Sequence, residues 1–262
     1  MLTISQYVRA ESIQQAYELN QKRSNAVLGG MHWLKLQKRN VGTAIDLSDL
    51  GLDTIEETED SFIIGAMVTL RQLELHRELN CFSNNALAES VRQIVGVQFR
   101  NMATVGGSIF GRYGFSDVLT VFLAMDAQVE LYNRGILSLE EFSELPYDRD
   151  LLIRLIVKKE KRKTVYLSQR NTKTDFPVLT CAVSETDGAY RFVIGARPKR
   201  AVCFYDKLGI LAKGITEAGA SELGNYICSQ VETGSNMRGS EEYRRILAGV
   251  LTKRALLQMK EM

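Results

Sequence analysis

Cysteine is scarce in this chain and never clustered. The four cysteines, Cys81, Cys181, Cys203 and Cys228, are scattered along 262 residues, and no C-x-x-C occurs. Iron–sulfur and structural zinc sites need close-set cysteines or histidines, so the chain supplies no recognisable site of either kind. Such scatter is typical of free, buried thiols in a reducing compartment, with disulfide pairing as the alternative.

Long apolar runs and an excess of one charge are also absent. No stretch reaches the ~18 apolar residues that a membrane-spanning helix requires, and the N-terminus lacks a charged segment followed by an apolar one. Lysine and arginine total 33 against 31 acidic residues, for a formal net charge of +2. So small a net charge does not create the positive surface potential that attracts the phosphate backbone of a nucleic acid. We therefore expect a cytoplasmic protein without a membrane or nucleic-acid partner.

Histidine is rarer still, with His32 and His76 alone, so a catalytic triad is not expected. His32 could protonate or stack near a ligand, but a histidine beside a tryptophan is more typical of a structural role. We expect His76 on a helix surface. Trp33 could cover an adenine ring, although core packing is the prediction we adopt. No G-x-G-x-x-G opens a helix, so a Rossmann site is not indicated.

The length allows two domains, and the first divides into two lobes. Residues 1–53 read as a βαβ-type unit with a helix capped by Ser12 and Gln15. Residues 54–155 form the second lobe, with a helix capped by Thr69 and Gln72. Further elements are expected as strands at 26–28, 44–47, 61–66 and 128–132, a helical face within 83–95, a helix or strand from 118, and an irregular acidic segment at 140–150.

The second domain is expected over residues 156–262. The charge-rich run 158–163 is interpreted as the solvated turn of a hairpin between strands 151–157 and 164–167, with an anion or partner patch as the alternative. Strands at 179–183 and 190–194 flank a turn at Asp187 and Gly188. Ser240 caps a closing helix, and its predicted buried stripe comprises Tyr243, Ile246, Leu247, Val250 and Leu251.

Two glycine pairs are the most informative features. The segment 100–109 reads R-N-M-A-T-V-G-G-S-I and is followed by Asp117 and an apolar run from 118 to 125. Glycine lets backbone approach a partner without a Cβ in the way, and bare N–H groups in such a loop suit pyrophosphate oxygens. The first pair, Gly29 and Gly30, follows the predicted strand 26–28. Either pair alone is also typical of a plain tight turn.

Taken in full, these strings resemble the FAD-binding subunit of the xanthine dehydrogenase and carbon monoxide dehydrogenase family of molybdenum hydroxylases. Segment 27–34 is similar to the family's first flavin loop, A-G-G-T-D-L-L, and 100–109 to its second, R-N-x-A-T-[IV]-G-G-N-I. Segments 45–47, 64–69, 170–177 and 240–251 resemble further family motifs in the same order, so the resemblance spans nearly the whole chain.

The resemblance implies a role for each matching residue. Main-chain N–H groups around Gly29 to His32 would hold the FAD diphosphate, Thr104 would donate its hydroxyl to a phosphate, and Asp117 would accept hydrogen bonds from ribityl or ribose hydroxyls. The complete implied set is Val27, Leu28, Gly29, Gly30, Met31, His32, Trp33, Val95, Gly96, Phe99, Ala103, Thr104, Gly106, Gly107, Ser108 and Asp117, with Leu151 and Leu152 near the isoalloxazine ring.

Four positions depart from the family pattern. Met31 and His32 replace a Thr-Asp pair, Ser108 replaces an asparagine, and Leu167 stands where many relatives have a basic residue close to the flavin. A missing positive charge near the ring makes anionic reduced flavin harder to stabilise. These departures bear on the affinity for FAD and on its redox behaviour.

The expected fold is therefore α+β, with a two-lobed FAD-binding domain of the vanillyl-alcohol-oxidase type and a smaller C-terminal domain built on a short antiparallel sheet. The resemblance implies an electron-transfer subunit without a catalytic acid or base or a metal of its own. Its expected partners are a molybdopterin-binding large subunit and a two-iron–two-sulfur small subunit, with NAD+ or another acceptor. A self-contained FAD oxidoreductase and a scaffold subunit that has lost FAD are the alternatives.

Overall fold

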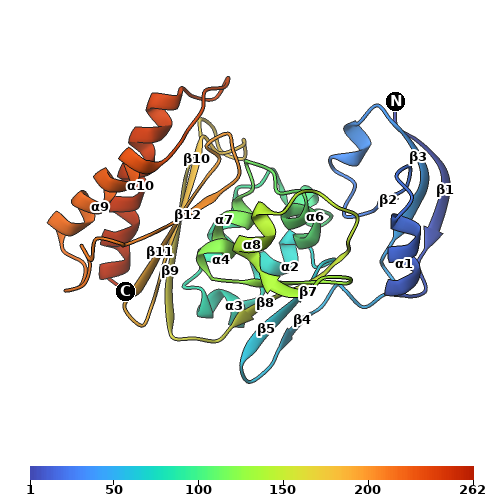
Figure 1. Ribbon diagram of the computed structural model, residues 1–262, viewed down its shortest axis with the longest axis horizontal. Coiled ribbons are helices and arrows are strands. Elements are labelled where there is room, and N and C mark those ends of the chain that lie inside the picture. The colour runs from blue at the N-terminus through green and yellow to red at the C-terminus, as the bar shows by residue number, and fades with distance from the viewer.

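Three sheets and their covering helices follow one another along the long axis of the molecule (Figure 1). The computed structural model describes residues 1–262. The N-terminal unit lies at one end, and helices α9 (Glu217–Gln230) and α10 (Glu241–Lys260) lie at the other. None of the helices is both long and apolar enough to cross a bilayer. The predicted α+β class is confirmed.

The N-terminal unit is a parallel sheet in the order β1-β3-β2, so the predicted βαβ organisation is confirmed. Its outer strand β1 was not predicted, because its residues are largely exposed and show no apolar pattern. Ser12 caps α1 as expected. The Gln15 side chain accepts the N–H of Glu11 and not that of Ser12, so the capping box is incomplete. The elements are β1 (Thr3–Arg9), α1 (Ile13–Asn20), β2 (Ala26–Val27), η1 (Leu34–Leu36) and β3 (Asn40–Asp46).

The second lobe combines a five-stranded antiparallel sheet, β4-β5-β8-β6-β7, with short helices around a core of 32 buried residues. The capping box of Thr69 and Gln72 is complete, as predicted. The elements are β4 (Ile55–Glu57), β5 (Ser61–Gly65), α2 (Leu70–Leu75), α3 (Arg77–Phe82), α4 (Ala86–Arg92), α5 (Val97–Arg100), α6 (Val105–Phe110), α7 (Asp117–Ala124), β6 (Gln128–Leu131), β7 (Gly135–Ser138), α8 (Leu139–Glu144) and β8 (Leu152–Lys158).

Two predictions for this lobe are corrected. The acidic segment is not irregular at its start, because Ser138 and Glu141 form a capping box that begins α8. His76 does not lie within a helix; it joins α2 to α3, where its Nδ1 accepts the N–H of Leu79. The segment from residue 118 is resolved as helix α7, which is buried along its whole length.

The C-terminal unit places α9 and α10 on one face of an antiparallel sheet, β12-β11-β10-β9, whose other face packs on α4 and α7. Its strands are β9 (Arg162–Gln169), β10 (Leu179–Thr186), β11 (Ala189–Gly195) and β12 (Val202–Tyr205). The predicted hairpin across the charge-rich run is wrong. Strand β8 pairs with β5 and β6, whereas β9 pairs with β10, so the run joins two different sheets. The boundary expected near residue 155 falls inside β8.

The four cysteines are free, but they are not uniformly buried. Cys181 is buried, Cys203 and Cys228 are half-buried, and Cys81 is exposed. Burial raises the pKa of the Cys181 thiol to about 12, which keeps it protonated at neutral pH. The expectation of buried thiols therefore holds for only part of the set.

Helix α10 buries a different stripe from the predicted one. Leu247 and Leu251 are buried as expected, but Tyr243, Ile246 and Val250 are exposed. Arg244 turns inward instead, with a relative exposure of 1%. Its guanidinium donates to the carbonyls of Val178 (2.9 Å), Gly234 (2.6 Å) and Gly239 (2.5 Å) and to the Asn236 side chain (2.6 Å). A buried charge is tolerated here because carbonyl oxygens surround it.

Arg244→Ala should therefore lower the free energy of unfolding by about 3 kcal/mol, because three carbonyls would lose a charged donor. Arg245→Ala, at an exposed neighbour without such contacts, should change it by less than about 0.5 kcal/mol. Urea unfolding of the two variants compares them directly. Similar losses in both would contradict this account of Arg244.

Candidate cofactor site

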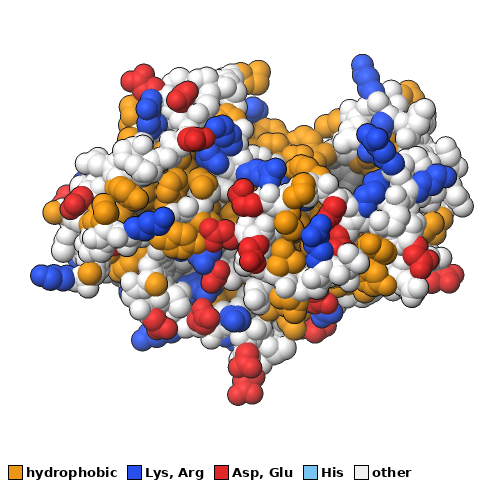
Figure 2. Space-filling view, in the orientation of Figure 1, with side chains coloured by type: hydrophobic (Ala, Val, Ile, Leu, Met, Phe, Trp, Pro, Cys, Tyr) orange, Lys and Arg blue, Asp and Glu red, His pale blue; other side chains and the backbone are white.

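A cavity of about 530 Å³ lies where the N-terminal unit, the second lobe and the β9–β10 connection meet. Figure 2 shows the surface hollowed beside the N-terminal unit, with hydrophobic side chains at the hollow. More than half of the residues that line the cavity are hydrophobic. This size and lining are typical of a site for a small organic ligand.

Strand β2 leads into a loop whose N–H groups have no partner in the protein. The Leu28 N–H still donates to the Ile45 carbonyl, 2.8 Å away. The next six N–H groups, of residues 29–34, donate no hydrogen bond within the chain. Gly30 and Met31 adopt left-handed φ values of 70° and 61°. Successive free N–H groups in such a turn form a concavity that suits an anion.

The second glycine pair has a different role from the one expected. The Gly106 N–H donates to the Ala66 carbonyl (2.8 Å), and the Gly107 N–H donates to Thr104 Oγ1 (3.1 Å). A Cβ at residue 106 would lie 2.6 Å from the Ala66 carbonyl oxygen. The expectation of bare N–H groups is wrong for both glycines, and Gly106 serves close packing against Ala66, the residue that follows β5.

The two loops interlock. A Cβ on Gly30 would lie 2.1 Å from the Met102 carbonyl oxygen, and a Cβ on Gly107 would lie 3.2 Å from the Gly29 carbonyl oxygen. Residue 30 has no room for a Cβ, whereas a Cβ at residue 107 would be a tight contact that requires its neighbours to shift by a few tenths of an ångström. The second loop thereby fixes the position of the first.

Thr104 stands at this contact and caps α6. Its Oγ1 accepts the Gly107 N–H, which leaves its hydroxyl proton without an acceptor in the protein. Ser108 uses its hydroxyl within the helix, where it donates to the Thr104 carbonyl at 2.9 Å. Of these two side chains, Thr104 alone retains a donor for a ligand.

Asp117, at the start of α7, belongs to a buried charged cluster. Arg170 Nη2 lies 2.5 Å from Asp117 Oδ1, and the side chains of both residues are 5% exposed. Tyr166, from β9, donates its hydroxyl to the same carboxylate. Burial raises the pKa of Asp117 to about 6, and Arg170 and Tyr166 limit the rise. The carboxylate is therefore ionised at neutral pH and tied to the C-terminal unit.

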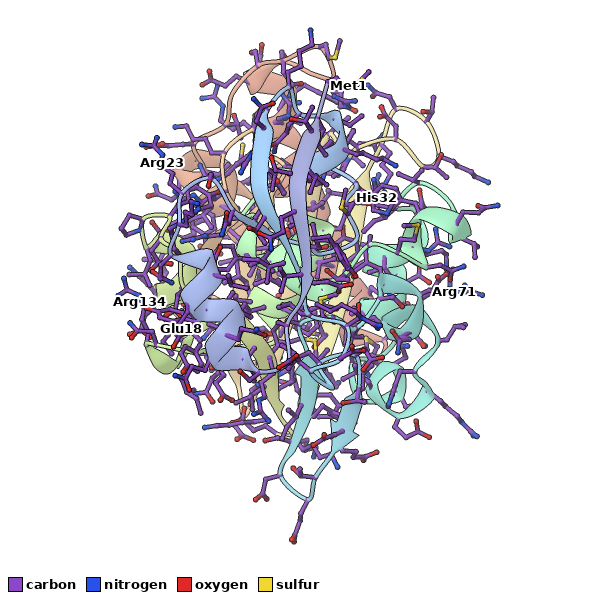
Figure 3. The ribbon with its side chains drawn as sticks, turned by 90° about the vertical axis from the view of Figure 1, so that its right-hand side faces the viewer. Met1, Glu18, Arg23, His32, Arg71 and Arg134 are labelled. Carbon is purple, nitrogen blue, oxygen red and sulfur yellow. The ribbon has the colours of Figure 1, made fainter.

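His32 lies flat against Phe99 with ring centroids 3.7 Å apart, and its Nε2 is 3.1 Å from the Phe99 carbonyl. Burial, and to a lesser degree the charge of Lys35, lowers the pKa of His32 below its ordinary value. The imidazole is therefore neutral at pH 7. In Figure 3 the loop bearing His32 and helix α1, labelled at Glu18, lie on opposite sides of strand β1.

The prediction that Trp33 packs in the core is wrong. The Trp33 side chain lies half-buried at the cavity. Its ring centroid is 5.8 Å from that of Tyr113, 5.3 Å from Phe115 and 5.8 Å from Phe176. These four rings come from the N-terminal unit, the second lobe and the β9–β10 connection. Aromatic packing therefore closes the cavity where the three parts of the chain meet.

The family comparison agrees with this geometry. Residues 3–159 match the model of the FAD-binding domain in molybdopterin dehydrogenases. The chain belongs to this family. The matched segment ends just after β8, where the chain leaves the five-stranded sheet.

Relatives extend over the whole chain. The uncharacterised protein YgfM of Escherichia coli K12 is 30% identical over 95% of this chain and 93% of its own length. The glyceraldehyde dehydrogenase medium chain of Sulfolobus acidocaldarius is 24% identical, with 97% of both chains covered. A solved chain of carbon monoxide dehydrogenase from Hydrogenophaga pseudoflava superposes with a TM-score of 0.88 at 22% identity, covering 98% of this chain and 97% of that one. This superposition shows that the fold is shared.

Most of the residues implied by the motifs line the cavity of this FAD-binding domain. They are Val27, Gly29, Met31, His32, Trp33, Val95, Phe99, Ala103, Thr104, Gly107, Ser108 and Asp117. The structure does not bring Leu28, Gly30, Gly96, Gly106, Leu151 or Leu152 to the cavity wall. Leu151 and Leu152 are buried in two of the cores. Leu167 packs against the core between the four-stranded sheet and the C-terminal helices.

Sequence reasoning missed a wall of the cavity. Arg170, Thr174, Asp175, Phe176 and Pro177 line it from the β9–β10 connection. Segment 170–177 was recognised as a family motif, but none of its residues was placed at the flavin site. Tyr113 and Phe115, between α6 and α7, were also missed. Alternation and spacing carry no signal for either segment, because only the tertiary fold brings them to the loops.

The residues present fit FAD. A diphosphate needs several converging donors, which the free N–H groups of residues 29–34 and the Thr104 hydroxyl supply. Two flat ring systems need apolar walls, which the aromatic cluster and Phe99 provide. The departures at Met31 and His32 leave the main-chain donors intact, since a side-chain change does not remove an N–H.

Gly30→Ala tests the interlocked loops. Gly51 has a similar φ of 66° but nothing within 4 Å of an added Cβ, so Gly51→Ala isolates the backbone strain. We expect Gly51→Ala to cost about 1 kcal/mol of folding free energy. Gly30→Ala should cost about 3 kcal/mol and weaken FAD binding, since the Met102 backbone must also move. Equal unfolding midpoints in urea for the two variants would refute the interlock.

Asp117→Asn tests the buried cluster. Removing one partner leaves Arg170 buried without a counter-ion, so the free energy of unfolding should fall by about 3 kcal/mol. Asp148→Asn breaks the more exposed pair between Asp148 and Arg134, 2.9 Å apart, and should cost less than about 1 kcal/mol. Chemical denaturation measures both. A loss in Asp117→Asn no larger than in the control would show that the pair contributes little.

Proposed function

We propose that this chain is the FAD-binding electron-transfer subunit of a molybdopterin-dependent hydroxylase or dehydrogenase. The observation that carries the proposal is the row of six unpartnered N–H groups at residues 29–34, five of which belong to residues that line the cavity. A site of this kind suits a diphosphate. Because the chain belongs to a family of FAD-binding domains, the diphosphate is that of FAD.

Each part of the site then has a task. The first loop holds the diphosphate through its main chain, and Thr104 adds one hydroxyl donor. Asp117, although already bound by Arg170 and Tyr166, has further acceptor capacity for a sugar or ribityl hydroxyl. The aromatic rings around Trp33 exclude water from one side of the cavity. FAD, when bound, accepts electrons singly and releases them in pairs, and this is the chemistry it supplies.

Partner subunits complete the proposed path. One relative is named a medium chain, and that name supports a complex in which other chains hold molybdopterin and a two-iron–two-sulfur cluster. Electrons would pass from that cluster to the flavin on this chain and on to NAD+ or another acceptor. We propose a cytoplasmic complex, and the substrate would be chosen by the molybdopterin subunit.

The visible absorbance spectrum tests this function. Protein mixed with FAD and then desalted should keep the two absorption bands of oxidised flavin. After chemical reduction under argon, added NAD+ should restore them if it is the acceptor. Protein that stays colourless, alone and when co-expressed with partner subunits, would favour the scaffold alternative. Reduction of the oxidised flavin by an organic substrate, with no partner subunit present, would favour a self-contained oxidoreductase.

A further inference from the structure

The cavity has one unpaired charged side chain. Its charged lining residues are Lys35, Asp117, Arg170 and Asp175. Asp117 is paired with Arg170, and Asp175 is paired at 3.1 Å with Arg238, which lies outside this cavity. The Lys35 ammonium takes part in no ion pair or hydrogen bond of the protein, and His32 is neutral at pH 7 because its pKa is lowered. Because each of the two ion pairs is neutral overall, the Lys35 ammonium leaves the cavity with a net positive charge.

The residue that carries this charge lines the same cavity as the free N–H groups and directly follows them in the chain. Lys35 follows the last of them, in η1, and its own N–H donates to the Met31 carbonyl at 3.0 Å. This hydrogen bond folds the chain so that Lys35 stays close to the left-handed turn at Gly30 and Met31. The Lys35 charge is among the causes that lower the pKa of His32, so its field reaches the loop.

We infer that Lys35 is the counter-ion for the diphosphate of the bound flavin nucleotide, an inference that rests on the proposed function. Neutral N–H groups orient a diphosphate but do not balance its charge, whereas an ammonium does. The paired arginine cannot take this role without releasing Asp117 inside the protein. The side chain that follows the anion-binding loop is therefore the available source of positive charge.

The test compares the affinity for FAD of the full chain and three variants. Lys35→Gln removes the charge, Lys35→Arg keeps it, and Lys38→Gln removes a nearby charge that does not line the cavity. Because Lys35 is exposed, we expect Lys35→Gln to weaken FAD binding about 5-fold at low ionic strength, with the difference shrinking as salt is added. Lys35→Arg and Lys38→Gln should bind FAD like the parent chain. Fluorescence titration at two salt concentrations measures all four.

A second readout separates charge from structural damage. The chain has two histidines, so the variant His32→Gln identifies the His32 ring signals in proton NMR spectra. In the FAD-free protein, Lys35→Gln should raise the pKa of His32, and Lys35→Arg should leave it unchanged. Equal FAD affinity in Lys35→Gln and the parent would overturn the inference and leave the proposed function standing. A parent chain that never binds FAD would overturn both.

Discussion

The interlock of the two glycine loops is the constraint on which the site depends. The backbone of Gly30 lies against the Met102 carbonyl, and the backbone of Gly107 lies against the Gly29 carbonyl. One loop leaves a parallel sheet in the N-terminal unit, and the other opens α6 in the second lobe. Because residue 30 has no room for a Cβ and residue 107 has only a tight fit for one, the two loops are held close together. The fixed position keeps six N–H groups free rather than folded back onto the protein.

A buried ion pair joins the third part of the chain to this frame. Asp117 begins α7 in the second lobe, while Arg170 follows β9 and is itself buried. The pair holds the β9–β10 connection over the cavity, where Phe176 meets Trp33. Segments from three separate sheets are thus brought together at the proposed cofactor site. The C-terminal unit is therefore part of the site, although the family match ends at residue 159.

The sequence predicted correctly those features that neighbouring residues determine, such as the start of a helix. Thr69 and Gln72 predicted the start of α2, because a capping box needs only two residues three positions apart. The glycine pairs are also local signals, and they lie on two loops that meet at the cavity. The hairpin across residues 158–163 was wrong because strand pairing is decided by distant partners. The stripe on α10 was wrong in part, because Arg244 turns inward to carbonyl partners at residues 178, 234 and 239, which periodicity does not reveal.

The most direct test of this account is hydrogen exchange at the two loops with and without FAD. If the first loop holds the diphosphate, the amides of residues 29–34 should exchange rapidly in the free protein and become protected when FAD binds. The amides of Gly106 and Gly107, already bonded within the protein, should change little. Protection that appears at Gly106 and Gly107 while residues 29–34 remain unprotected would contradict the account.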